Sequence, residues 1–303
     1  MKLSNFLTSI YNKLLSDEIK ERGERVILII SIIGFLVHLA VIYLKDFGVL
    51  NFHSESDLLK NPIAAIYTPF SFILIYEVYL LVYYLPRSIT TYISKQYEII
   101  TLIIIRRLFK DLASLKLSSD WFQIKDDLQF TYDLVASVLL FYLLYLFFKK
   151  SKLRYTISKN NTATDANIIK FINFKKAIAI CLVPVLIALA LYIFGSWIYH
   201  TAYQIEEASI LFKDINNIFF DEFFTILIIV DVLLLLLSFF HTNQFHKVIR
   251  NSGFVISTIL IRLSFSVDGL VNTVLIIVAV VFGLLILTVH NEYEKNILKD
   301  HDK

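Results

Sequence analysis

Residues 219–240 read FFDEFFTILIIVDVLLLLLSFF, and this stretch decides the fold class. A transmembrane α-helix needs about 20 consecutive, mostly apolar residues. From position 223 onward the stretch contains a single charged side chain, that of Asp231. We therefore expect a helix that crosses a membrane and carries one carboxylate near its middle.

The composition of the whole chain agrees with a membrane environment. Hydrophobic residues make up 57% of the 303 residues and charged residues 18%, whereas soluble domains contain roughly 45–50% and about 25%. The 26 Phe and 17 Tyr residues suit lipid-facing and interfacial positions. The net charge of +3 gives no indication of nucleic-acid binding, and the single cysteine, Cys181, excludes an intramolecular disulfide and a thiolate metal cluster.

Six apolar runs are long enough to span a bilayer, and two further runs carry basic residues in their middles. If all eight runs span, the loops alternate between two sides, and 20 of the 29 Lys and Arg residues fall on the side that holds both termini. Basic residues are enriched in cytoplasmic loops, so both termini are predicted to be cytoplasmic. The sequence thus predicts an all-α, multi-pass protein of the cell membrane. The apolar runs are 26–44, 64–85, 134–148, 177–197, 219–240 and 271–290, and the charged runs are 99–117 and 254–267.

The eight predicted helices form two similar four-helix halves. With an offset of about 154 residues Glu77 corresponds to Asp231, and with one residue of slippage Arg107 corresponds to Arg262. Because each half has an even number of spans, the two halves are predicted to be parallel repeats. The predicted order is a cytoplasmic amphipathic helix (1–25), the first half (26–148), a basic cytoplasmic linker (149–176), the second half (177–290) and a cytoplasmic tail (291–303).

Charged side chains within the predicted spans are the candidate functional residues. Counted from the predicted turns, Glu77 lies at the depth of Arg106 and Arg107, and Asp231 lies at the depth of Arg262. An unpaired charge at the bilayer centre costs roughly 2.5–3.5 kcal/mol, so we expect acid–arginine ion pairs there. A pair that only fixes helix register is an equally open interpretation. The candidates for an ion pathway or for gating are Glu77, Arg106, Arg107, Lys110, Asp111, Asp231 and Arg262.

This arrangement resembles voltage-sensor modules, which are four-helix units in which an acid on one helix offsets arginines on another. The resemblance is carried by Glu77 with Arg106, Arg107 and Lys110, and by Asp231 with Arg262. The basic residues lie on the third helix of each half rather than the fourth, and they lack a regular three-residue spacing. The resemblance implies a response to voltage, since moving one charge across the membrane is worth about 2.3 kcal/mol per 100 mV.

Other motifs argue against metal, cofactor and enzyme chemistry. His241, His246 and His290 fall at one predicted membrane face, but their spacing fits no standard zinc pattern, so we predict no metal site. The sequence contains no glycine-rich phosphate loop, no hydrolase motif and no TVGYG-like potassium filter. We therefore expect no bound cofactor and no enzymatic activity.

Two functions are predicted as alternatives. The first is an ion channel, or an ion- or voltage-sensing protein, with buried acid–arginine pairs at mid-bilayer. The second is a non-conducting membrane subunit or scaffold in which the same pairs are structural. The expected partners are the lipid bilayer, inorganic ions, and either a second copy of the chain or a membrane partner protein, with no nucleic acid.

Overall fold

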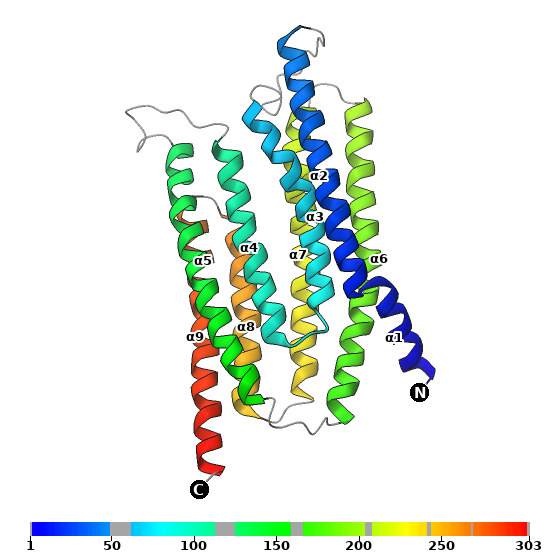
Figure 1. The fold of residues 1–303 in the computed structure, drawn as a ribbon. Helices are drawn as coiled ribbons and strands as arrows, with labels where there is room; N and C mark the ends of the chain where they lie inside the picture. Colours follow the sequence, from blue (N-terminus) through cyan, green and yellow to red (C-terminus); the bar gives the residue numbers. More distant parts are fainter. Residues whose placement is uncertain are drawn as a thin grey trace. The chain divides into compact units, whose positions relative to one another are not determined.

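A computed structural model of the chain describes residues 2–48, 62–112, 125–158, 166–203, 208–240, 244–267 and 269–301. These ranges are helical apart from short turns and contain no strand, which confirms the predicted all-α class (Figure 1). The elements are α1 (Lys2–Leu14), α2 (Asp17–Asp46), the short 3-10 helix η2 (Pro62–Ile66), α3 (Tyr67–Tyr84), α4 (Ile89–Leu112), α5 (Lys125–Ser158), α6 (Ala166–Tyr203), α7 (Ala208–Phe239), α8 (Phe245–Ser264) and α9 (Leu270–His301).

Five helices contain a segment that is long and apolar enough to cross a membrane, which is compatible with a multi-pass integral membrane protein. They match five of the six predicted apolar runs, and the sixth corresponds to the shorter apolar helix Thr68–Tyr84. Helix α4 contains residues 99–112 of the first charged run, and α8 contains residues 254–264 of the second. Neither helix is among the five that are long and apolar enough to cross a membrane, so the eight-span arrangement stays a prediction. The five segments are Thr8–Asp46, Asp127–Lys152, Ile169–Leu189, Glu222–Phe239 and Leu270–Ile297.

Apolar side chains face outward and several polar side chains face inward. Six aliphatic residues of α2 are more than half exposed, namely Val26, Ile29, Ile32, Ile33, Leu36 and Val37. Conversely, polar residues at most 5% exposed include Gln96, Asp133, Asp231 and Ser257. Large exposed apolar surfaces mark contact with another apolar phase or a partner. This distribution is compatible with lipid around the outward-facing aliphatic side chains.

The chain divides into two compact units, each assembled from three separate segments. Unit 1 comprises Met1–Tyr83, Arg106–Phe130 and Ile178–Ile226, and unit 2 comprises Tyr84–Ile105, Thr131–Ala177 and Leu227–Lys303. Each unit draws segments from both predicted halves. The duplicated halves 26–148 and 177–290 therefore stay a prediction about sequence similarity.

In unit 1, the predicted amphipathic N-terminal helix is interrupted at Ser16. Helix α1 ends at Leu14, and the Oγ of Ser16 accepts a hydrogen bond from the backbone N–H of Ile19 at 3.3 Å. A serine at this position satisfies a free N–H of the first turn, and the acids Asp17 and Glu18 complement the positive end of the helix dipole. The second part of residues 1–25 thus begins α2, the first candidate span.

Helix α2 packs against α3 through polar contacts in unit 1. The Tyr76 hydroxyl donates to the carbonyl of Lys20 at 3.2 Å, and Nδ1 of His38 lies 2.6 Å from Oγ1 of Thr68. His38 is therefore a packing residue, and its hydrogen bond couples the first span to the start of α3.

In unit 2, α8 and α9 form a hairpin. At the turn Gly269 adopts a positive φ of 76°, a conformation that glycine reaches without steric cost. The side-chain amide of Asn272 donates to the carbonyl of Ser264 at 2.6 Å and satisfies a group at the end of α8. Helix α5 packs on this hairpin through Phe147, whose ring lies 5.8 Å from that of Phe254.

The helices continue beyond the apolar runs on which the predictions were based. Helix α5 extends to Ser158 and α6 begins at Ala166, so the predicted linker 149–176 is helical at both ends, and residues 159–165 lie outside the described part of the chain. The predicted tail 291–303 continues α9 as far as His301. Side chains at the linker ends are therefore held in helical register and can contribute to the interior.

Candidate functional site

Asp231 is a buried carboxylate in the apolar part of α7. Asp231 stands between Val230 and Val232 in the sequence, and it is 4% exposed. Moving an ionised carboxylate out of water is costly unless charged or hydrogen-bonding groups surround it. The neighbours of Asp231 therefore determine what this carboxylate can do.

Helix α4 supplies two neutral groups to Asp231. The side-chain amide of Gln96 donates to Oδ2 of Asp231 at 3.1 Å. Tyr92 lies one turn earlier on the same face of α4, and its hydroxyl interacts electrostatically with the same carboxylate. Both side chains are at most 5% exposed. One face of α4 therefore places two polar side chains against the carboxylate of Asp231.

Helix α6 supplies the positive charge through Lys175. This residue is 6% exposed, and its ammonium group attracts the carboxylate of Asp231. The Nζ atom itself donates to the backbone carbonyl of Arg87 at 2.8 Å and lies 5.5 Å from the centre of the Phe171 ring. We call Tyr92, Gln96, Lys175 and Asp231 the Asp231 cluster.

A chain of hydroxyl groups lies next to this cluster. The Tyr97 hydroxyl and Oγ of Ser257 are 2.6 Å apart, and Ser257 donates to the carbonyl of Ala279 at 2.6 Å. These contacts connect α4, α8 and α9. The Tyr97 ring also packs edge-on against Phe147, with 5.1 Å between the ring centres. The buried face of α4 is therefore fixed on the side next to Gln96.

A second polar cluster joins α8 to the C-terminal part of α9. The guanidinium of Arg250 donates to Oδ1 of Asn251 through Nε at 3.1 Å and Nη2 at 2.8 Å. Its Nη1 lies 3.0 Å from Nε2 of His290, and because arginine has no acceptor atom, this nitrogen accepts the bond. Arg250 and His290 are both at most 5% exposed.

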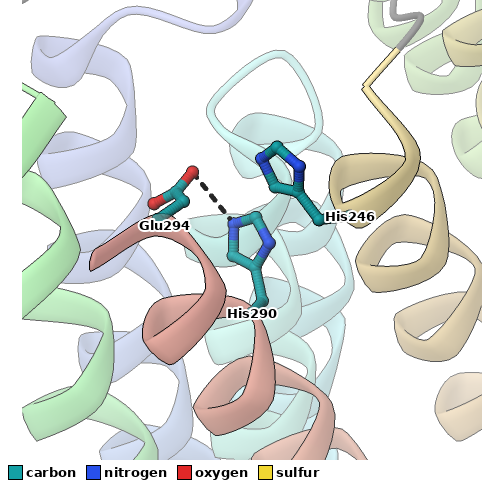
Figure 2. A group of neighbouring side chains, drawn as sticks. All are labelled: His246, His290 and Glu294. Carbon is teal, nitrogen blue, oxygen red and sulfur yellow. Dashed lines mark ion pairs between the residues drawn. The ribbon is translucent and has the colours of Figure 1, made fainter. Parts of the chain in front are cut away.

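His246 and Glu294 complete this group at its edge. Oε1 of Glu294 lies 3.1 Å from Nε2 of His290, and the His246 ring stacks on that of His290 with 5.2 Å between the ring centres (Figure 2). Burial, followed by the proximity of His290, lowers the pKa of His246 and favours its neutral ring. We call His246, Arg250, Asn251, His290 and Glu294 the His290 cluster.

Both clusters are defined by the chemistry of their own side chains. Comparisons with protein-family models, with curated proteins and with solved structures found no match to this chain.

Asp231 is the predicted site residue whose surroundings are best described. Its contacts come from α4 and α6, and Arg262 is not among them in the described residues. The reason is the length of α8, which begins nine residues before the predicted run at 254. Asp231 lies eight residues before the end of α7, whereas Arg262 lies 17 residues into α8, a difference of about 13 Å along antiparallel helices.

The observed helix ends also change the relative depth of the first predicted pair, Glu77 with Arg106 or Arg107. Helix α4 begins at Ile89, ten residues before the predicted run at 99, so Arg106 and Arg107 lie 17 and 18 residues into it. Glu77 lies only seven residues before the end of α3. Counted from the observed helix ends, these distances from the turn are unequal, and the acid–arginine ion pairs stay a prediction. Glu77, Arg106, Arg107, Lys110, Asp111 and Arg262 stay predicted pathway or gating residues.

Three members of the Asp231 cluster were missed because they lie outside the predicted spans. Tyr92 and Gln96 precede position 99, and Lys175 falls in the predicted linker. One signal for the early start of α4 was present in the sequence, since Ser88 accepts the backbone N–H of Thr91 at 3.2 Å as a helix N-cap. His241, which was grouped with His246 and His290, lies outside the described residues.

Proposed function

We propose that this chain is a multi-pass membrane protein that conducts or senses a small cation, with Asp231 as the group that binds it. The observation that carries the proposal is a carboxylate, 4% exposed, enclosed by polar side chains of α4 and α6 within an apolar helix. Ionisable groups inside membrane helices usually mark ion or proton pathways.

The chemistry of the Asp231 cluster supports cation binding. Carboxylate, amide and phenol oxygens are hard ligands of the kind that small cations prefer. The carboxylate can also take up a proton. When no other cation is present, the ammonium group of Lys175 balances the negative charge of Asp231. A bound cation would balance that charge in place of Lys175. The carboxylate of Asp231 can thus be balanced either by Lys175 or by a bound cation.

Eight membrane crossings with both termini in the cytoplasm are part of the proposal. Helix α4 has 24 residues and α8 has 20, which correspond to lengths of about 36 and 30 Å. The hydrocarbon core of a bilayer is about 30 Å thick, so both helices are long enough to cross it. In this arrangement Glu77, Arg106, Arg107, Lys110, Asp111 and Arg262 are the residues on which voltage would act.

The test is flux through the purified full-length protein in lipid vesicles and planar bilayers. Protons, sodium and potassium are supplied one at a time, and Asp231→Asn is expected to reduce the transported ion's flux by about tenfold or more, as expected for loss of a charged ligand. The matched control is Asp133→Asn, which changes a second buried acid among the described residues of unit 2, held by Thr273 at 3.1 Å, and should keep the flux. In the same bilayers, Arg107→Gln and Arg262→Gln are expected to change the voltage dependence of the current.

A silent wild-type protein across ions, voltages and pH values would contradict the proposal, and so would full flux in Asp231→Asn. The second candidate is a non-conducting membrane subunit or scaffold, favoured by the hydrogen bonds through which Tyr97 and Ser257 tie α4, α8 and α9 together. There, Asp231→Asn would alter thermal stability in a protein that passes no current. Neither candidate includes an enzymatic step.

A further inference from the structure

The edge of the His290 cluster brings three potential metal ligands together. His246 lies in the first turn of α8, and His290 and Glu294 lie one turn apart on the same face of α9. One ligand atom of each residue lies within 4.8 Å of the other two. Figure 2 shows the two rings and the carboxylate gathered between the two helices.

Two imidazoles and one carboxylate form a donor set suited to zinc and neighbouring divalent transition metals. Ligand atoms around such an ion lie about 2.0–2.2 Å from it, so the three groups must approach one another by roughly 1 Å or more. The stacked His246 ring must also turn, since an imidazole binds metal in the plane of its ring. His246 is only partly buried at the start of its helix, and turning its ring would also exchange its stacking contact with Tyr293.

Arg250 is the group that competes with a metal. Its Nη1 lies 3.0 Å from Nε2 of His290, the nitrogen that also lies 3.1 Å from Glu294. A cation bound to this nitrogen would have to replace the guanidinium. Arg250 could keep both of its hydrogen bonds to Asn251 after such a change, so the contact with His290 is the one exchanged.

We propose that His246, His290 and Glu294 bind one divalent transition-metal ion of the zinc class, which replaces Arg250 at Nε2 of His290. The ion connects the start of α8 to the last part of α9 and thereby stabilises the hairpin. Arg250 holds the site closed in the absence of metal. This site is separate from the Asp231 cluster and does not depend on the proposed ion function.

The test is metal titration of the full-length protein in detergent, after removal of any affinity tag and treatment with a chelator. Zinc is followed by calorimetry, and cobalt is followed by its visible ligand-field absorption, which reports nitrogen and oxygen ligands directly. One ion per chain is expected, together with a rise in the melting temperature. His246→Gln, His290→Gln and Glu294→Gln are each expected to weaken binding by about tenfold or more.

The chain has seven histidines, so a matched control is needed. His38→Gln changes the histidine that contacts Thr68 in unit 1 and should leave zinc affinity unchanged. Arg250→Met should tighten zinc binding by about tenfold, because the competing cation is gone. If Arg250→Met fails to fold, the cobalt spectra of the three ligand variants still decide. Absence of binding, or binding that survives all three ligand substitutions, would overturn the proposal.

Discussion

The Asp231 cluster and the His290 cluster solve the burial of charge in different ways. Asp231 is a carboxylate within an apolar segment, and its partners come from α4 and α6, far away in the sequence. Arg250 is a cation whose contacts include its own neighbour Asn251 and a histidine of the next helix. The first cluster therefore couples three helices through charge, and the second joins one hairpin through hydrogen bonds.

This difference predicts how strongly each cluster resists change. Removing one partner of a buried pair of opposite charges leaves the other charge uncompensated, whereas removing a neutral partner costs one hydrogen bond. The substitutions below separate these effects, and they run from the largest expected loss of stability to the smallest.

Lys175→Met should give the largest loss, because it leaves Asp231 in the interior without its positive charge. We expect the free energy of unfolding to fall by about 3 kcal/mol, because the carbonyl of Arg87 also loses its donor, measured by denaturant titration in detergent. Lys170→Met is the matched control, since Lys170 is an exposed lysine of the same helix. The double variant Lys175→Met/Asp231→Leu should regain most of the loss. A single variant as stable as the control would show that no charge coupling joins α6 to α7.

The sequence predicted Asp231 itself, because one acid in a long apolar run stands out from its neighbours. It did not predict Tyr92, Gln96 or Lys175, because polar residues at helix ends look the same as those in surface loops. Their burial depends on how far α4 and α6 extend beyond the apolar runs, and tertiary contacts fix those ends. Hydropathy alone thus indicated the five candidate spans and one residue of the Asp231 cluster, whereas helix boundaries decided the partners of that residue.

Gly283→Ala should give the second largest effect, because this glycine allows α9 to approach Tyr97 beside the Asp231 cluster. An added Cβ would overlap the Tyr97 hydroxyl and lie 2.9 Å from Cζ, and the ring is held by Ser257 and Phe147. We expect a loss of about 2 kcal/mol in the free energy of unfolding. Adding Tyr97→Phe should relieve the strain.

Gly253→Ala provides the comparison near the His290 cluster. There the added Cβ would lie 2.8 Å from Cγ1 and 3.0 Å from Cγ2 of Ile286, which is a milder overlap than that with the Tyr97 hydroxyl. Its effect in the same denaturant titration should therefore be smaller than that of Gly283→Ala. Equal losses would indicate that both helix contacts are equally rigid, and the contrast between the two clusters would then concern charge alone.

Ser238→Ala should give the smallest effect, because it removes only neutral contacts of the His290 cluster. Ser238 donates to the carbonyl of Leu235 within its own helix, and the Asn251 amide approaches its Oγ at 3.5 Å, which is long for a hydrogen bond. We expect a loss of about 0.6 kcal/mol or less, the average for such bonds between membrane helices. Gln96→Leu is the matched variant in the Asp231 cluster, and because its partner is a carboxylate, it should cost about 1.5 kcal/mol or more. If the two variants lose the same stability, the carboxylate of Asp231 does not strengthen its hydrogen bond, and a buried charge no longer distinguishes the two clusters.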